Sequence, residues 1–149
     1  MVAIAEALAG MGCAGVSLGD TTGMATPTRV EALLAALAGK VPALNCHFHD
    51  TRGTGLANLL AAVQAGCTDF DSAVGGLGGS PTATGAAGNV ASEDVVHMLD
   101  DMGVATGVDL DALLAAARLA AGLVDHPLRS RVLAAGPRTR RLADQEVGR

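Results

Sequence analysis

The stretch Ala43-Leu-Asn-Cys-His-Phe-His49, followed by Asp50-Thr-Arg-Gly-Thr-Gly55, decides the fold class. Its first seven residues form a short and mainly apolar run of the kind found in buried strands, and the glycines that follow predict a loop. A helical stretch over residues 56–65 comes next and stops at Gly66. This order of strand, loop and helix is the repeating unit of α/β folds with a parallel sheet.

The same unit recurs on both sides of this stretch, so we expect about four parallel strands with covering helices. The other expected elements are apolar runs bounded by glycine, proline or a capping residue. They are helix 2–11, strand 16–18, a helix from Thr26-Pro27 to Gly39, strand 69–74, a glycine-rich loop over 75–88, a short strand at 89–91, and helices 92–102 and 109–124. We assign residues 1–137 to one domain and expect a loose tail over 138–149.

Two architectures fit this pattern, a doubly wound sheet and a (β/α)₈ barrel. A barrel typically needs about 250 residues, whereas this chain has 149 and only about four strand positions. The chain also opens with a sequence that resembles the middle of a helix. We therefore expect the C-terminal half of a TIM barrel, equivalent to strands 5–8.

The composition excludes several classes of protein. The chain has a formal net charge of −5, and its basic residues gather only near the C-terminal end, so we expect no nucleic-acid partner. None of its apolar runs reaches the ~18 residues that a membrane span needs, so we expect no membrane partner. Its three cysteines form no C-x-x-C pair. That pattern indicates free thiols in a reducing compartment, and we expect a cytoplasmic protein.

The pair His47 and His49 gives the strongest functional signal. Alternate side chains of a strand share one face, so both imidazoles are expected to point the same way, with Asn45 beneath them. Cys46 and Phe48 should point toward the helices instead. Two imidazoles at the end of a buried strand can chelate a divalent metal. The alternative is two unrelated histidines of the core or a loop.

Three other segments carry weaker signals. Asp20 follows a strand, where the active sites of barrels lie, although a loop-capping role is the alternative. The glycine-rich loop ends in Ser80-Pro81 and has a backbone that can fold over a ligand, although a plain flexible loop is the alternative. Asn89 can offer an amide oxygen to a hard cation, or it can simply occupy a turn.

Together these segments resemble the hydroxymethylglutaryl-CoA lyase family. The resemblance is carried by Gly15-Val-Ser-Leu-Gly-Asp-Thr-Thr-Gly, His47-Phe-His-Asp-Thr, Asp71-Ser-Ala-Val-Gly-Gly-Leu-Gly-Gly-Ser-Pro and Gly85-Ala-Ala-Gly-Asn-Val-Ala-Ser-Glu-Asp-Val-Val-His-Met-Leu. It covers roughly residues 4–136. The glycine-loop and Gly-Asn-Val-Ala segments are specific to this lyase and its close relatives. The His-x-His-Asp-Thr segment is shared with aldolase, carboxylase and Claisen-condensing members of the same barrel superfamily.

The resemblance implies a carbon–carbon lyase that cleaves hydroxymethylglutaryl-CoA to acetyl-CoA and acetoacetate, a step of leucine catabolism, with Mg²⁺ or Mn²⁺. His47, His49 and Asn89 match three of the family's metal ligands. The fourth, an Asp beside a catalytic Arg, would lie upstream of Met1. Asp20 matches an acidic residue that handles the proton of the substrate's tertiary hydroxyl. We therefore expect an acyl-CoA substrate, and a homodimer or pairing with an N-terminal half as possible assemblies.

The chain departs from the family pattern at three positions. Ser80 stands where the lyase usually has a catalytic Cys, and a hydroxyl exchanges protons near neutral pH less readily than a thiol. Thr82 replaces an aromatic residue. Arg52 replaces a Tyr, and it either meets an anionic group or faces solvent. Two rival functions follow, namely a related lyase or aldolase for another hydroxyacyl-CoA or oxo acid, and a non-catalytic metal-binding fragment.

Overall fold

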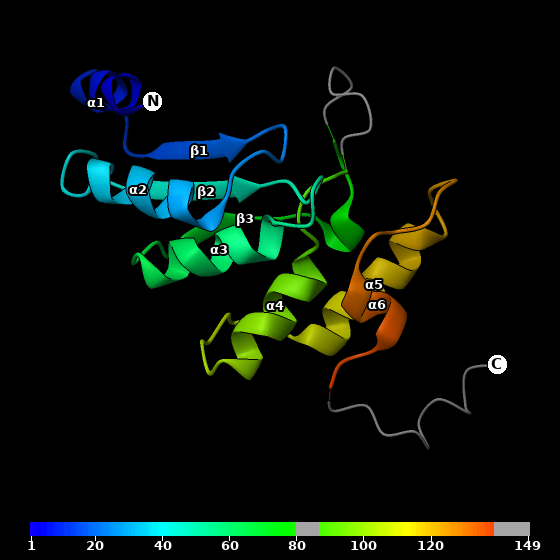
Figure 1. The fold of residues 1–149 in the computed structure, drawn as a ribbon. Coiled ribbons are helices and arrows are strands. Elements are labelled where there is room, and N and C mark those ends of the chain that lie inside the picture. The colour runs from blue at the N-terminus through cyan, green and yellow to red at the C-terminus, as the bar shows by residue number, and fades with distance from the viewer. Residues whose placement is uncertain (80–86, 139–149) are drawn as a thin grey trace.

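A computed structural model describes residues 1–79 and 87–138 of the chain (Figure 1). Ser80, Thr82 and the tail over 139–149 therefore lie outside the described residues. The elements, in chain order, are α1 Val2–Gly10, β1 Val16–Asp20, α2 Pro27–Leu37, β2 Leu44–Phe48, α3 Gly55–Gln64, β3 Asp69–Asp71, the 3₁₀ turn η1 Val74–Gly76, α4 Ser92–Asp101, α5 Leu110–Ala121 and α6 Arg131–Ala135.

The three strands form one parallel sheet in the order β1-β2-β3, which confirms the expected α/β class. Because consecutive parallel strands are neighbours, their carboxyl ends meet at one edge of the sheet. Leu18 lies opposite Cys46, and His47 lies opposite Asp71. The sequence had extended the third strand to Val74, but the chain turns into η1 there, with Gly75 at a φ of +65°.

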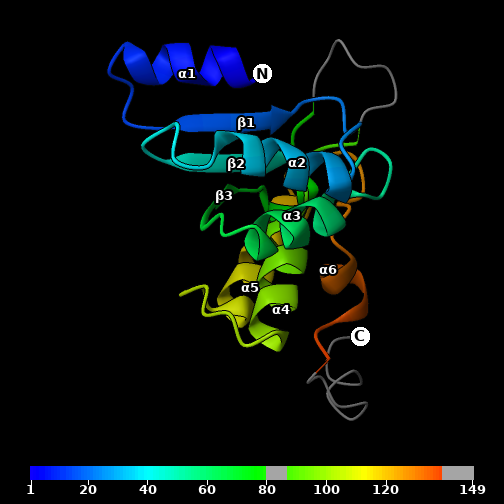
Figure 2. The same ribbon diagram turned by 60° about the vertical axis from the view of Figure 1, so that its left-hand side comes forward.

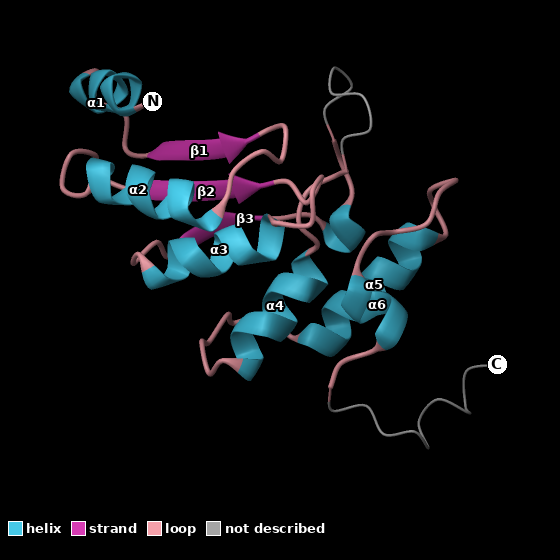
Figure 3. Cartoon of the chain, in the orientation of Figure 1, coloured by secondary structure: helices cyan, strands magenta, loops and turns pink. Residues whose placement is uncertain are grey.

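Helices α2 and α3 lie side by side and cover one face of this sheet (Figures 1 and 3). Cys46 and Phe48 point into that layer and are buried, as expected from strand alternation. Leu37 of α2 and Leu59 of α3 are completely buried against them. The core is therefore a layer of apolar side chains between the helices and the strands.

The opposite face of the sheet is polar, with Ser17, Asn45, His47 and Asp71 along it. A doubly wound sheet would carry helices on both faces. None of the described helices lies across this polar face (Figures 1 and 2). A sheet covered on its outer face alone is the arrangement of a barrel segment rather than that of a doubly wound fold.

The helices α4, α5 and α6 pack together beyond β3 (Figure 2). Asp94, in the first turn of α4, holds the start of α6. Its carboxylate accepts hydrogen bonds from the Ser130 hydroxyl at 2.9 Å and from the backbone N–H groups of Arg131 at 3.0 Å and Val132 at 2.8 Å. Helix α6 was absent from the sequence-based expectation, because a run of five residues is too short to show helical periodicity.

The fourth strand expected at residues 89–91 is not formed as a strand, so the sheet has three strands among the described residues. Two isolated bridges stand in its place, an antiparallel one between His49 and Asn89 and a parallel one between Ala73 and Ala91. The segment still bonds to the chain at the end of β2 and just after β3, since Val90 N–H donates to the Phe48 carbonyl at 3.0 Å and the Val90 carbonyl accepts from Ala73 N–H at 3.2 Å. Helix α4 begins at Ser92, which leaves no room for a longer strand.

The path of residues 88–91 depends on a close crossing of two backbone segments at Gly88. A Cβ at this position would lie 2.1 Å from the Gly76 carbonyl oxygen and 2.3 Å from that of Gly78. Both obstacles are backbone atoms, so no side-chain rotation can remove the clash.

We expect Gly88→Ala to lower the free energy of unfolding by about 1–3 kcal/mol, because the crossing must open. Gly10→Ala is the matched control, since a Cβ there meets no atom within 4 Å and Gly10 is helical. Urea unfolding followed by circular dichroism compares the two variants. Equal stability of Gly88→Ala and the native chain would contradict the crossing described here.

Burial and the neighbouring thiol of Cys67 raise the pKa of the Cys46 thiol from 9.0 to about 12. Its sulphur lies 3.7 Å from that of Cys67, inside the helix-covered layer. A thiol with so high a pKa stays protonated near neutral pH, and the protonated form is a poor nucleophile. Cys13, by contrast, is exposed.

We therefore expect iodoacetamide at neutral pH to modify Cys13 and to leave Cys46 unmodified until the chain is unfolded. Mass spectrometry of peptides from the native and the urea-unfolded protein measures the two rates. Rapid modification of Cys46 in the native protein would contradict its burial beneath α2 and α3.

Candidate functional site

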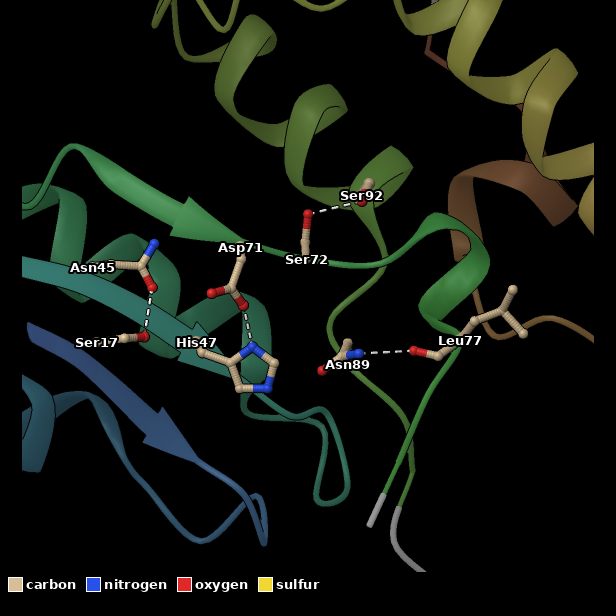
Figure 4. Close-up of polar contacts among 8 residues, drawn as sticks. All are labelled: Ser17, Asn45, His47, Asp71, Ser72, Leu77, Asn89 and Ser92. Carbon is tan, nitrogen blue, oxygen red and sulfur yellow. Dashed lines mark hydrogen bonds and ion pairs between the residues drawn. The ribbon is translucent and has the colours of Figure 1, made fainter.

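The site lies at the edge of the sheet where the parallel strands end. His47 is near the end of β2, and its Nδ1 contacts Oδ1 of Asp71, the last residue of β3 (Figure 4). Asn45, one pleat earlier on the same face, accepts a hydrogen bond from the Ser17 hydroxyl at 2.8 Å. The amide of Asn45 is therefore engaged with β1 and not with the imidazole above it.

His49 follows β2 directly, and the structure brings it beside His47 as the sequence predicted. The two ring centroids are 5.0 Å apart, and the rings meet edge to face at 62°. The isolated bridge between His49 and Asn89 adds the third predicted ligand to the same place. His47, His49 and Asn89 thus converge, although the chain separates the histidines from Asn89 by forty residues.

Two buried polar atoms of this group have no hydrogen-bond partner among the described residues, Nδ1 of His49 and Oδ1 of Asn89. The amide nitrogen of Asn89, Nδ2, donates to the Leu77 carbonyl at 2.9 Å (Figure 4). The amide oxygen is therefore the atom that has no partner. An unpaired buried acceptor costs free energy unless something else satisfies it. An imidazole nitrogen and an amide oxygen are both suitable ligands for a divalent cation. The residues present therefore fit such an ion.

Electrostatics favour the neutral form of His49. Burial lowers its pKa below 6.5, and the neighbouring imidazole of His47 acts in the same direction, because two adjacent rings cannot both carry a positive charge without repulsion. Asp20, the backbone at Ala87 and the side chain of Asn89 oppose this shift without cancelling it. The neutral imidazole is the form that binds a metal, because only it has a free nitrogen lone pair.

Asp20 closes β1 at the same edge of the sheet. Its two carboxylate oxygens accept hydrogen bonds from the backbone N–H groups of Met24 at 2.9 Å and Ala25 at 3.1 Å. The loop-capping role considered as the alternative is therefore present. A carboxylate oxygen can accept more than one hydrogen bond, so this role leaves lone pairs for a substrate.

Arg52 joins the loops that follow β1 and β2. Its guanidinium donates to the backbone carbonyls of Thr22 at 2.9 Å and Gly23 at 3.2 Å. Arg52 is exposed, as in the solvent-facing alternative drawn from the sequence, and its guanidinium bonds to backbone carbonyls. Arg52 thereby ties the loop that carries Asp20 to the strand end that carries the histidines.

Sequence reasoning missed two acidic residues that support the site. Asp71 has no role in the sequence-based expectation, because it falls within the strand expected over residues 69–74, whereas the structure ends β3 at this residue. Glu93 is completely buried, and its carboxylate accepts the Gly75 N–H at 2.9 Å and 3.0 Å. It thereby anchors the turn from which the glycine-rich loop departs.

In the parts of the chain that the structure describes, no three His, Cys, Asp or Glu side chains form a group that would hold a metal ion. The group formed by His47, His49 and Asn89 contains only two such side chains, because its third member is an amide. The described helices include none that is long and apolar enough to cross a membrane.

Comparisons with known proteins place this geometry in a family. Hydroxymethylglutaryl-CoA lyase YngG of Bacillus subtilis is 48% identical over 135 residues, which are 89% of this chain and 45% of that protein. The (R)-citramalyl-CoA lyase of Chloroflexus aurantiacus is 47% identical over 137 residues, 91% of this chain and 43% of that protein. This chain therefore spans a little under half the length of these relatives.

Solved structures agree with the fold. An HMG-CoA lyase from Acinetobacter baumannii, in complex with coenzyme A and 3-methylmalate, superposes with a TM-score of 0.89 at 40% identity over 93% of this chain and 46% of that one. The lyase from Bacillus subtilis gives a TM-score of 0.84 at 48% identity over 90% of this chain and 46% of its own length. Since these neighbours are TIM barrels, the expected partial barrel is confirmed.

The family model described as HMGL-like matches residues 1–120, which is well over half of the chain. On this match, and on the lyases it resembles along most of its length, the chain belongs to the HMGL-like family.

Proposed function

We propose that this chain forms part of a metal-dependent carbon–carbon lyase that cleaves hydroxymethylglutaryl-CoA to acetyl-CoA and acetoacetate. One observation carries the proposal: two buried polar atoms without partners among the described residues, Nδ1 of His49 and Oδ1 of Asn89, lie beside His47 at the carboxyl ends of the parallel strands. Barrel enzymes place their active sites at this end. The relatives that match this chain include hydroxymethylglutaryl-CoA lyases.

Enzymes of this family depend on a divalent metal, and here His47, His49 and Asn89 would hold Mg²⁺ or Mn²⁺. When bound, the ion supplies Lewis-acid chemistry that favours ionisation of a substrate hydroxyl. His49 is suited to this task because its lowered pKa keeps the ring neutral. Asp20 would take up the proton of the tertiary hydroxyl, and its backbone hydrogen bonds hold the carboxylate at the end of β1.

The proposal also includes Ser80, in the glycine-rich loop, as a residue that would contact the substrate. Glu93 fixes the beginning of this loop through Gly75, so the loop departs from a rigid point. The three free thiols support a reducing, cytoplasmic setting for the protein.

The first test is metal binding, measured by isothermal titration of Mn²⁺ into the purified chain. We expect saturable binding that disappears in the double variant His47→Ala, His49→Ala. The matched control is His97→Ala, His126→Ala, which removes the same number of imidazoles from positions outside the strand end. Binding that survives loss of His47 and His49, or is lost equally in the control, contradicts the proposed metal site.

The second test is turnover of hydroxymethylglutaryl-CoA. This chain contains neither the Asp ligand nor the catalytic Arg that the resemblance places upstream, so we expect no useful activity from the chain alone. A chimera that joins the upstream part of the Bacillus subtilis relative to this chain should restore turnover. Robust activity of the chain alone would contradict this expectation.

A related lyase activity is the second candidate, and Ser80 in place of the family's Cys is the observation that favours it. One relative of nearly equal identity is an (R)-citramalyl-CoA lyase. Assaying the chimera against hydroxymethylglutaryl-CoA and citramalyl-CoA separates the two substrates. A ratio of kcat/KM in favour of citramalyl-CoA would replace the first candidate with the second.

A further inference from the structure

The contact between His47 and Asp71 joins two neighbouring strands at the site. In the parallel pairing His47 lies opposite Asp71, and the Nδ1 and Oδ1 atoms of these residues meet on the polar face of the sheet (Figure 4). The side chain of His47 is 27% exposed and that of Asp71 is 54% exposed. The pair therefore sits at the mouth of the site rather than within the core.

The chemistry of the two groups decides which of them donates the hydrogen bond in this contact. An ionised carboxylate only accepts hydrogen bonds, so Nδ1 of His47 must carry the proton. In a neutral imidazole the other nitrogen, Nε2, then keeps its lone pair and becomes the nitrogen that can bind a metal. A carboxylate bound to the far side of a ligating imidazole also fixes the ring's orientation and makes it a stronger ligand.

The described groups around the His47 ring show that Asp71 is the one that bonds to its Nδ1. Asn45, the other polar group on the same face of β2, accepts its hydrogen bond from Ser17. His49 meets the His47 ring edge to face, as a neighbour and not as a hydrogen-bond partner. Among the described residues Asp71 is the hydrogen-bond partner of the His47 ring.

We propose that Asp71 is a positioning residue, which holds His47 in the tautomer with the proton on Nδ1 and so leaves Nε2 as the nitrogen that can bind a metal. This inference rests on the proposed function of His47 as a ligand. It assigns Asp71 no contact with metal or substrate. The chain also carries an internal control, because Asp69 has the same charge and lies one pleat earlier on the same face of β3.

The test is the tautomer of His47 in the metal-free protein, read from the ¹⁵N chemical shifts of its ring in alkaline buffer. We expect the native chain to carry the proton on Nδ1. Asp71→Ala should release the ring to a mixture of tautomers, and Asp69→Ala should leave it unchanged. A native His47 with its proton on Nε2 overturns the proposal even if Asp71→Ala fails to fold.

Mn²⁺ titration of the same three proteins gives the second readout. Loss of a carboxylate behind a ligating imidazole typically weakens metal affinity by about 10–100-fold, and we expect this for Asp71→Ala but not for Asp69→Ala. Weaker binding in Asp71→Ala with an unchanged tautomer would make Asp71 a direct ligand and overturn the positioning role. If the native chain has the expected tautomer but binds no Mn²⁺, the proposed metal site fails while the orienting role of Asp71 stands.

Discussion

The backbone pairing around β2 is the constraint on which the rest of the structure depends. Parallel pairing with β1 and β3 brings Asp20, His47 and Asp71 to one edge of the sheet. The hydrogen bond from Val90 N–H to the Phe48 carbonyl then draws the segment after the glycine-rich loop to the same edge. Without these bonds the two histidines would still share one face of their strand, but Asn89 would not be brought to them.

Strand alternation places the site residues and the core residues of β2 on opposite faces of the sheet. Its odd-numbered side chains form a polar face that is left open by the described helices, and its even-numbered side chains pack beneath α2 and α3. Cys46 therefore lies between two site residues in the sequence and yet on the opposite side of the sheet from them. Its thiol serves packing, whereas the imidazole of His47 serves the site.

Two buried acidic residues fix the positions of a loop and a helix near this site. Glu93 and Asp94 are neighbours in α4, yet Glu93 fixes the turn before the glycine-rich loop and Asp94 fixes the start of α6. Each carboxylate is stabilised by N–H or hydroxyl donors rather than by a basic side chain. The first turn of α4 thus anchors both the turn before the glycine-rich loop and the start of helix α6.

The sequence by itself determined the α/β class, the shared face of His47 and His49, and the family resemblance, because strand alternation and local motifs are properties of neighbouring residues. It also gave Asn89 as a candidate ligand, first as an amide that can meet a hard cation and then through that resemblance. The tertiary structure alone decided that residues 89–91 form two bridges in place of a strand, that Arg52 ties two loops together, and that Asp71 stands behind His47. These features depend on contacts between residues far apart in the chain, and no local pattern records which distant groups will meet.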